Sequence, residues 1–171
     1  MKTVLLFFAS LASLTCFAQQ SIGDVERLDD EINLLFGEDA AIEILAEGFS
    51  WSEGPVWVPQ LNAVLFTDVP ENKLYRWDET NGLSIFLEPS GYTGYAPNEK
   101  KAGGNGLILD PEGNLLIAQH GDRRIAKIMA PLDKAGDFTT VVDRFEGKRF
   151  HSPNDLILHS NGDLYFTDPP Y

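Results

Sequence analysis

The sequence has only one cysteine, Cys16, among its 171 residues. This cysteine lies in an apolar, small-residue run from Val4 to Ala18, a pattern typical of a secretory signal peptide. Cleavage after Ala18 would remove residues 1–18 and the cysteine with them, so we predict a secreted or periplasmic protein without disulfides. A lipoprotein anchored through Cys16 is the alternative, but Thr15 before it is a poor match to such a site.

Long hydrophobic runs and basic residues are also scarce. The N-terminal run is too short to span a bilayer comfortably, so we expect no membrane span. The 13 Lys and Arg residues stand against 26 Asp and Glu residues, which gives a formal net charge of −13. Because an acidic surface repels phosphates, we exclude nucleic acid as a partner. The same acidity permits divalent cations without requiring them. A Gly-x-Ser-x-Gly motif is absent, so the sequence gives no support to a serine hydrolase mechanism.

What the sequence does contain is one pattern in three copies. In each copy a polar residue heads an apolar run, a turn follows, and a second apolar run ends on a polar residue. The head residues, spaced 52 and 49 residues apart, are Glu53, Asn105 and Asn154. The end residues, spaced 51 and 49 residues apart, are Asp68, Gln119 and Asp168. A period near 50 residues, built from short strands, predicts a β-propeller.

Turn residues divide the repeated pattern into strands. The first predicted blade has strands at Val56–Pro59, Ala63–Thr67, Lys73–Asp78 and Leu83–Glu88. The second has strands at Leu107–Asp110, Leu115–Gln119, Arg124–Met129 and Phe138–Arg144, and a third blade begins at Asp155. Six blades at this period need about 300 residues. We therefore expect an all-β fold, a six-bladed β-propeller of which this chain holds about the first two and a half blades.

The segment before the first repeat differs in composition. Residues 19–40 form a polar, acidic N-terminal arm, in which Asp29 to Phe36 could form a short helix or a docking arm. From Ala41 the apolar residues alternate with other residues, which predicts a strand over Ile42 to Ala46. The predicted organisation is a signal peptide at 1–18, the arm at 19–40 and a partial propeller at 41–171.

The three head residues carry the candidate chemistry. The innermost strand of each blade faces the central channel, so Glu53, Asn105 and Asn154 should converge at one mouth of the propeller. Carboxylate and amide oxygens that converge in this way suit a hard cation such as calcium. The alternative is structural, because polar residues at strand starts commonly cap turns.

Four motifs stand in order along the chain: Ser-Glu-Gly-Pro-Val-Trp at 52–57, Gly-Asn-Gly-Leu at 104–107, Ser-Pro-Asn-Asp at 152–155 and Tyr-Phe-Thr-Asp-Pro-Pro-Tyr at 165–171. Together they resemble the gluconolactonase family, which also contains senescence marker protein (regucalcin), and the resemblance covers about residues 42–171. It implies a six-bladed propeller with a divalent cation, commonly Ca²⁺, at the axial mouth.

The resemblance also implies roles for particular residues. Glu53 falls on the family's metal-binding glutamate, and Asn154 falls on an asparagine at or beside the metal and substrate, which makes it both a metal and a catalytic candidate. Asn105 carries over as a residue that lines the substrate site. The remaining metal ligands would lie beyond Tyr171. Ser152 stands where the senescence-marker branch has an arginine, so a sugar-acid contact from that position is not expected.

The histidines and the repeated aspartates are weaker candidates. His120 and His151 are candidate substrate-binding residues, although His120 could equally be structural. His159 is expected on a solvent-facing turn. Because Asp68 and Asp168 recur at the same repeat position, we interpret them as caps of the following turn.

The pattern as a whole favours a metal-dependent hydrolase that opens a small-molecule sugar lactone such as gluconolactone. In this hypothesis the cation polarises the lactone carbonyl for attack by water. A metal-dependent esterase or phosphotriesterase is a second possibility. A non-catalytic exported propeller that serves as a binding module is a third, from a different class.

Overall fold

The computed structural model describes residues 21–97, 101–133 and 136–171, so the predicted signal peptide lies outside the described residues. The chain divides into two units, Met1–Glu47 and Gly48–Tyr171. Among the described residues there is no helix with the length and apolar character needed to cross a membrane.

Residues 21–47, the part of the first unit that the structure describes, have little regular structure. A short 3-10 helix, η1 (Asp30–Leu34), begins after Asp29, whose carboxylate accepts a hydrogen bond from the Glu31 backbone N–H at 2.9 Å. This turn confirms the short helix predicted for the arm. The strand predicted over Ile42 to Ala46 is wrong, because only Glu43 in that segment pairs, through an isolated bridge to Ser21. A lone strand cannot form without a neighbour to complete its hydrogen bonds.

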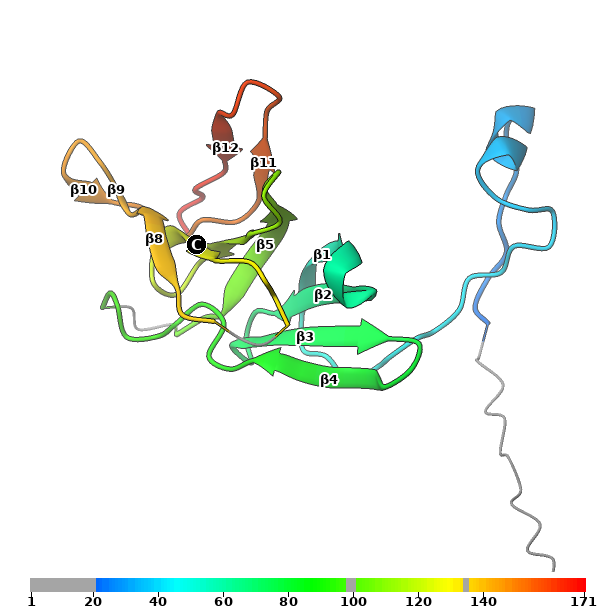
Figure 1. The fold of residues 1–171 in the computed structure, drawn as a ribbon, viewed down its shortest axis with the longest axis horizontal. Coiled ribbons are helices and arrows are strands. Elements are labelled where there is room, and N and C mark those ends of the chain that lie inside the picture. The colour runs from blue at the N-terminus through cyan, green and yellow to red at the C-terminus, as the bar shows by residue number, and fades with distance from the viewer. Residues whose placement is uncertain (1–20, 98–100, 134–135) are drawn as a thin grey trace, which may run out of the picture. The chain divides into compact units, whose positions relative to one another are not determined.

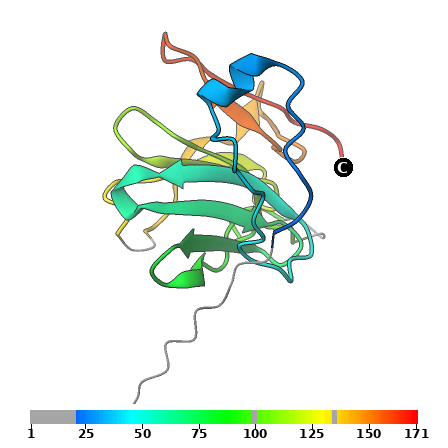
Figure 2. The same ribbon diagram turned by 90° about the vertical axis from the view of Figure 1, so that its right-hand side faces the viewer.

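The second unit consists of antiparallel sheets (Figure 1). The first sheet has the order β1 (Ser52–Val58), β2 (Ala63–Asp68), β3 (Lys73–Asp78) and β4 (Gly82–Leu87), with a short 3-10 turn, η2 (Pro59–Leu61), after β1. Figure 2 shows the strands of this sheet lying side by side in chain order. The second sheet has the order β5 (Gly104–Leu109), β6 (Leu115–Gln119), β7 (Arg124–Ile128) and β8 (Thr139–Val142).

Two hairpins follow the second sheet. The strands β11 (Leu156–Leu158) and β12 (Leu164–Phe166) pair as the first half of a third blade, as the repeat predicted. A smaller hairpin, β9 (Arg144–Phe145) and β10 (Lys148–Arg149), was not expected from the sequence. Each full sheet is a four-stranded meander, which is the blade of a propeller. The predicted all-β propeller class, with about two and a half blades in this chain, is confirmed.

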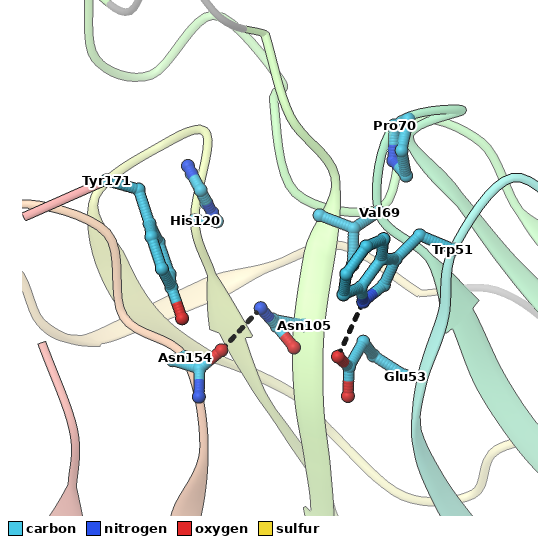
Figure 3. A pocket seen from close by; sticks show the side chains of 8 residues that line it. All are labelled: Trp51, Glu53, Val69, Pro70, Asn105, His120, Asn154 and Tyr171. Carbon is cyan, nitrogen blue, oxygen red and sulfur yellow. Dashed lines mark hydrogen bonds between the residues drawn. The ribbon is translucent and has the colours of Figure 1, made fainter. Parts of the chain in front are cut away.

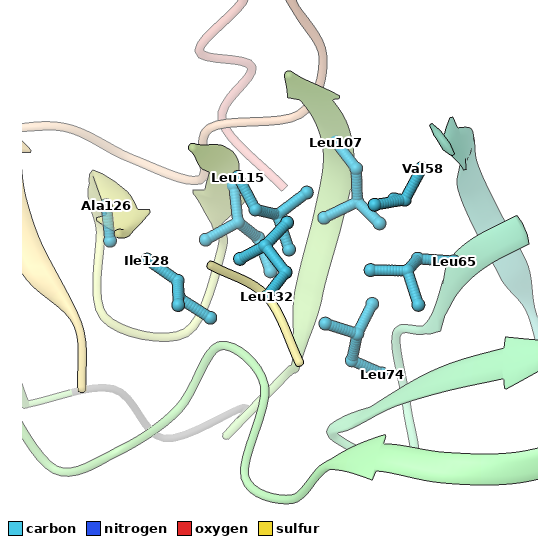
Figure 4. Close-up of a cluster of buried hydrophobic side chains, with 9 residues drawn as sticks. Val58, Leu65, Leu74, Leu107, Leu115, Ala126, Ile128 and Leu132 are labelled. Atoms are coloured by element: carbon cyan, nitrogen blue, oxygen red, sulfur yellow. The ribbon is translucent and has the colours of Figure 1, made fainter. Parts of the chain in front are cut away.

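The core lies between the blades, and β6 is buried on both of its faces. Successive side chains of a strand point to opposite faces of the sheet. Leu115 and Ile117 therefore join the cluster between the first two blades, while Leu116 and Ala118 pack with Leu156 of the third. The full first cluster, most of which Figure 4 labels, is Val58, Leu65, Leu74, Leu107, Leu115, Ile117, Ala126, Ile128 and Leu132.

A buried carboxylate fixes the long crossing between the first two blades. Asp122 has no exposed surface, and it accepts hydrogen bonds from the backbone N–H groups of Thr93 and Tyr95, with N···O distances of 3.1 Å. Its partner Arg124 lies 3.4 Å away and packs over the Tyr95 ring. Burial lowers the pKa of the Arg124 guanidinium, and the Asp122 carboxylate opposes this shift. The crossing that leads into β5 is thus held against the blade.

Asp78 closes the turn between β3 and β4. Its Oδ1 accepts hydrogen bonds from the backbone N–H groups of Asn81 and Thr80 at 2.8 and 3.0 Å, and Arg76 lies 3.0 Å from its Oδ2. The Asn81 N–H contributes most to holding the pKa of Asp78 below its ordinary value; burial opposes the shift, and the Arg76 charge supports it. The ionised carboxylate is therefore favoured in the folded state.

We expect the stabilisation from Asp78 to depend on pH. A lowered folded-state pKa contributes stability above the unfolded-state pKa, and this contribution is lost as the pH falls through the folded-state value. Asp78→Asn should therefore lower the free energy of unfolding at neutral pH and by progressively less in acid. Urea unfolding across a pH series measures this, with exposed Asp137→Asn as the control. A deficit that does not change with pH would contradict the prediction.

Candidate functional site

The inner strands of neighbouring blades approach backbone to backbone. A Cβ atom on Gly54 would lie 2.5 Å from the carbonyl oxygen of Asn105, and one on Gly106 would lie 2.9 Å from the carbonyl oxygen of Asn154. The Gly106 N–H donates to that Asn154 oxygen at 2.8 Å. The glycine that follows each of the first two head residues therefore permits the next blade to come close.

The first two head residues also lie at irregularities in their strands. The pairing of β1 with β2 shifts register between Glu53 and Val56, and the pairing of β5 with β6 shifts between Gly104 and Leu107. A β-bulge at such a point bends the strand and re-aims the side chain beside it. The two irregularities differ by one residue in their position: Glu53 is the last paired residue before the first, whereas Asn105 lies within the second.

The three head residues line one pocket of about 240 Å³ (Figure 3). Each comes from a different blade, and this is the convergence that the repeat predicted. The pocket also has aromatic and aliphatic walls. Its lining residues are Trp51, Glu53, Val69, Pro70, Asn105, His120, Asn154 and Tyr171.

Hydrogen bonds orient the polar groups of the pocket. Asn105 donates from Nδ2 to the Oδ1 of Asn154 at 2.8 Å. The indole Nε1 of Trp51 donates to the Oε1 of Glu53 at 2.7 Å. Figure 3 shows both bonds, with the amide oxygen of Asn105 turned toward Glu53. Each polar head group is therefore positioned by a neighbouring side chain.

The donor set suits part of a hard-cation site. One carboxylate and two amides supply oxygen atoms, the ligands that calcium and magnesium prefer. The Oε2 of Glu53 accepts no hydrogen bond from the residues that the structure describes, so it is available to a cation. Within those residues no three His, Cys, Asp or Glu side chains gather as a metal cluster, so a cation here would depend on the amide oxygens as well.

Comparison with known proteins identifies the family. The sequence pattern of the SMP-30/Gluconolactonase/LRE-like region matches residues 51–171. The chain belongs to this family. It is 39% identical over 153 residues to a gluconolactonase from Zymomonas mobilis, a match that covers 88% of this chain and 42% of the relative. The family resemblance seen in the sequence is confirmed.

Solved structures agree with this assignment. A gluconolactonase from Xanthomonas campestris is 29% identical with a TM-score of 0.64, and the match covers 78% of this chain and 40% of that one. A structural-genomics structure assigned as a gluconolactonase is 38% identical with a TM-score of 0.63, and covers 74% and 39%. The chain thus spans about two fifths of the length of these relatives.

The two candidate substrate-binding histidines have different positions in this member of the gluconolactonase family. His120 lines the pocket, and its nearly buried ring stacks on Tyr171 with centroids 5.7 Å apart. His151 is exposed, is not among the residues that line the pocket, and donates its backbone N–H to Asp168. Its substrate contact stays a prediction. His159 lies in an exposed turn beside Asn161, as expected.

The repeated aspartates have a structural role, but not at the turn that follows them. Asp68 accepts hydrogen bonds from the backbone N–H groups of Ser50 and Trp51 at 2.9 and 3.1 Å. Asp168 accepts from His151 and Ser152 at 2.9 and 2.8 Å. Both therefore cap the segment that enters the first strand of their own blade, just before the head residue. The predicted capping of the following turn is wrong.

Sequence reasoning missed four residues of the pocket wall. Trp51 lies two positions before Glu53, and the alternation of an extended chain could have placed it on the same face. Val69 and Pro70 follow the end of β2 directly, at the mouth where the head residues lie. For Tyr171 the sequence carries no such signal, because it follows two prolines with no strand pattern.

We expect Gly106→Ala to separate the second and third blades. The added Cβ would lie 2.9 Å from the Cα of Asp155 and from the backbone oxygen of Asn154, and backbone atoms cannot move aside as a flexible side chain can. Overpacking of this kind costs about 2 kcal/mol. Urea unfolding of the complete protein measures the loss. Gly37→Ala, in the exposed arm, is the matched control, and equal stability of both variants would contradict the prediction.

Proposed function

We propose that the complete protein hydrolyses a sugar lactone with the help of a divalent cation, most simply Ca²⁺. The observation that carries this proposal is the meeting of Glu53, Asn105 and Asn154, one from each blade, in a single pocket. Membership of the family and the likeness to gluconolactonases from two bacteria support it.

Glu53 and Asn154 would hold the cation, with Asn105 beside them. When bound, a divalent cation supplies Lewis-acid polarisation of the lactone carbonyl. In the reaction, water adds to the carbonyl carbon, the ring C–O bond breaks, and the product is the open hydroxy acid. The remaining ligands and the proton acceptor would come from later blades of the complete protein.

The chain's own residues orient and enclose the reactants. The bond from Asn105 to Asn154 fixes both amide planes before anything binds, which reduces the reorganisation needed at the reaction step. The rings of Trp51 and Tyr171 and the aliphatic Val69 and Pro70 form walls against which the carbon face of a sugar ring can pack.

We expect Glu53→Gln and Asn154→Ala, made in the complete protein, to reduce hydrolysis of glucono-δ-lactone by about 100-fold or more, because each removes an oxygen that would hold the cation, and the cation stabilises the charge that develops on the carbonyl oxygen. Proton release, corrected for spontaneous ring opening, measures the rate. Far-ultraviolet circular dichroism should show an unchanged fold.

The matched control is Glu112→Gln, since Glu112 is exposed at the turn between β5 and β6, at the opposite end of the strand from Asn105. Wild-type turnover should also fall when a chelator is added. Undiminished lactone hydrolysis in both site variants would refute the proposal. If turnover is sensitive to the chelator but phosphotriesters or simple esters are the preferred substrates, the metal dependence stands and the proposed lactone substrate is wrong. No turnover of any of these compounds would favour a non-catalytic binding module.

We also propose export. The Val4 to Ala18 run supports it as a signal peptide, with release of a mature chain that begins at Gln19. Intact-mass measurement of the protein from its native host tests this. A mass that retains residues 1–18, or a lipid on Cys16, would contradict it.

A further inference from the structure

Trp51 combines features that packing alone does not explain. Its side chain is 64% exposed, yet its single polar atom is engaged with the pocket carboxylate, at 2.7 Å from Oε1 of Glu53. Its ring also lines the pocket (Figure 3). The N–H of an exposed indole usually donates to water. In Trp51 it donates to the carboxylate of Glu53 instead.

The backbone of Trp51 is fixed from two sides. Its N–H donates to the buried carboxylate of Asp68 at 3.1 Å, and its carbonyl accepts from the N–H of Val69 at 3.1 Å. Asp68 is the last residue of β2, the strand that pairs with β1, and Val69 follows it directly. The indole therefore projects from a rigid base, although it lies at the surface.

We propose that Trp51 is a positioning residue that holds Glu53 in its ligating orientation; this inference rests on the proposed function. A glutamate side chain has three rotatable bonds, and ordering them opposes binding. The indole bond engages Oε1 and leaves Oε2 for the cation. Because indole is a donor only, Trp51 orients the carboxylate without competing with it for the ion.

The test is Trp51→Phe in the complete protein, which keeps an aromatic ring and removes the N–H. Groups that orient a metal ligand are typically worth about 10- to 100-fold in metal affinity. Calorimetric titration with CaCl₂ should therefore show about tenfold weaker binding. Lactone hydrolysis should need correspondingly more Ca²⁺ for half-activation.

Terbium supplies a readout that does not depend on activity or on loss of affinity. Tb³⁺ replaces calcium at oxygen sites and emits when a nearby indole is excited. Trp57→Phe is the matched control, because Trp57 lies at the other end of β1 and does not line the pocket. Sensitised emission should persist in Trp57→Phe and fall to background in Trp51→Phe, even with the site saturated.

The outcomes separate the inference from the function on which it rests. Wild-type Ca²⁺ affinity in a folded Trp51→Phe variant would overturn the positioning role and leave the lactonase proposal intact. Emission that depends on Trp57 instead of Trp51 would also overturn it. If neither Ca²⁺ nor Tb³⁺ binds the wild-type complete protein, the proposed function itself fails.

Discussion

The close approach of successive inner strands is the contact on which the rest of this structure depends. At Gly54 and at Gly106 one backbone lies so near the next that a single methyl group would overlap it. Each contact falls one residue after a head residue, Glu53 or Asn105. The requirement that brings the blades together therefore also brings their head groups into one pocket, and folding and site assembly share the same atoms.

Burial follows from the same arrangement. A blade can cover its apolar faces only with its neighbours, so the second sheet, with a blade on each side, has a strand buried on both faces. The hairpin of β11 and β12 has one covered face, and Ile157 and Tyr165 on the other are more than half exposed.

The period of about 50 residues predicted the blades, because every unit solves the same packing problem with the same pattern. The convergence of Glu53, Asn105 and Asn154 followed from it. The strand positions did too, except that β1 and β5 begin at Ser52 and Gly104, four and three residues before their predicted starts. What the period could not predict lies outside the repeat. The β9–β10 hairpin has no counterpart in the first blade, and Ile42 to Ala46 has the alternation of a strand without a partner. The backbone N–H groups that Asp68 caps depend on which segment passes it in the folded chain, and the sequence around Asp68 does not contain that information.

The polar groups of the pocket are oriented by side chains of the chain itself. Glu53 is held by Trp51, and Asn154 by Asn105, whose strand belongs to the preceding blade. Because one of these bonds lies within a blade and the other crosses between blades, a small rotation of one blade would alter the second and spare the first. The amide pair is thus sensitive to blade packing, whereas the carboxylate depends on the local geometry at the start of β1. The bond that orients the single negative charge of the pocket therefore lies within one blade, whereas the bond that orients the amides depends on two.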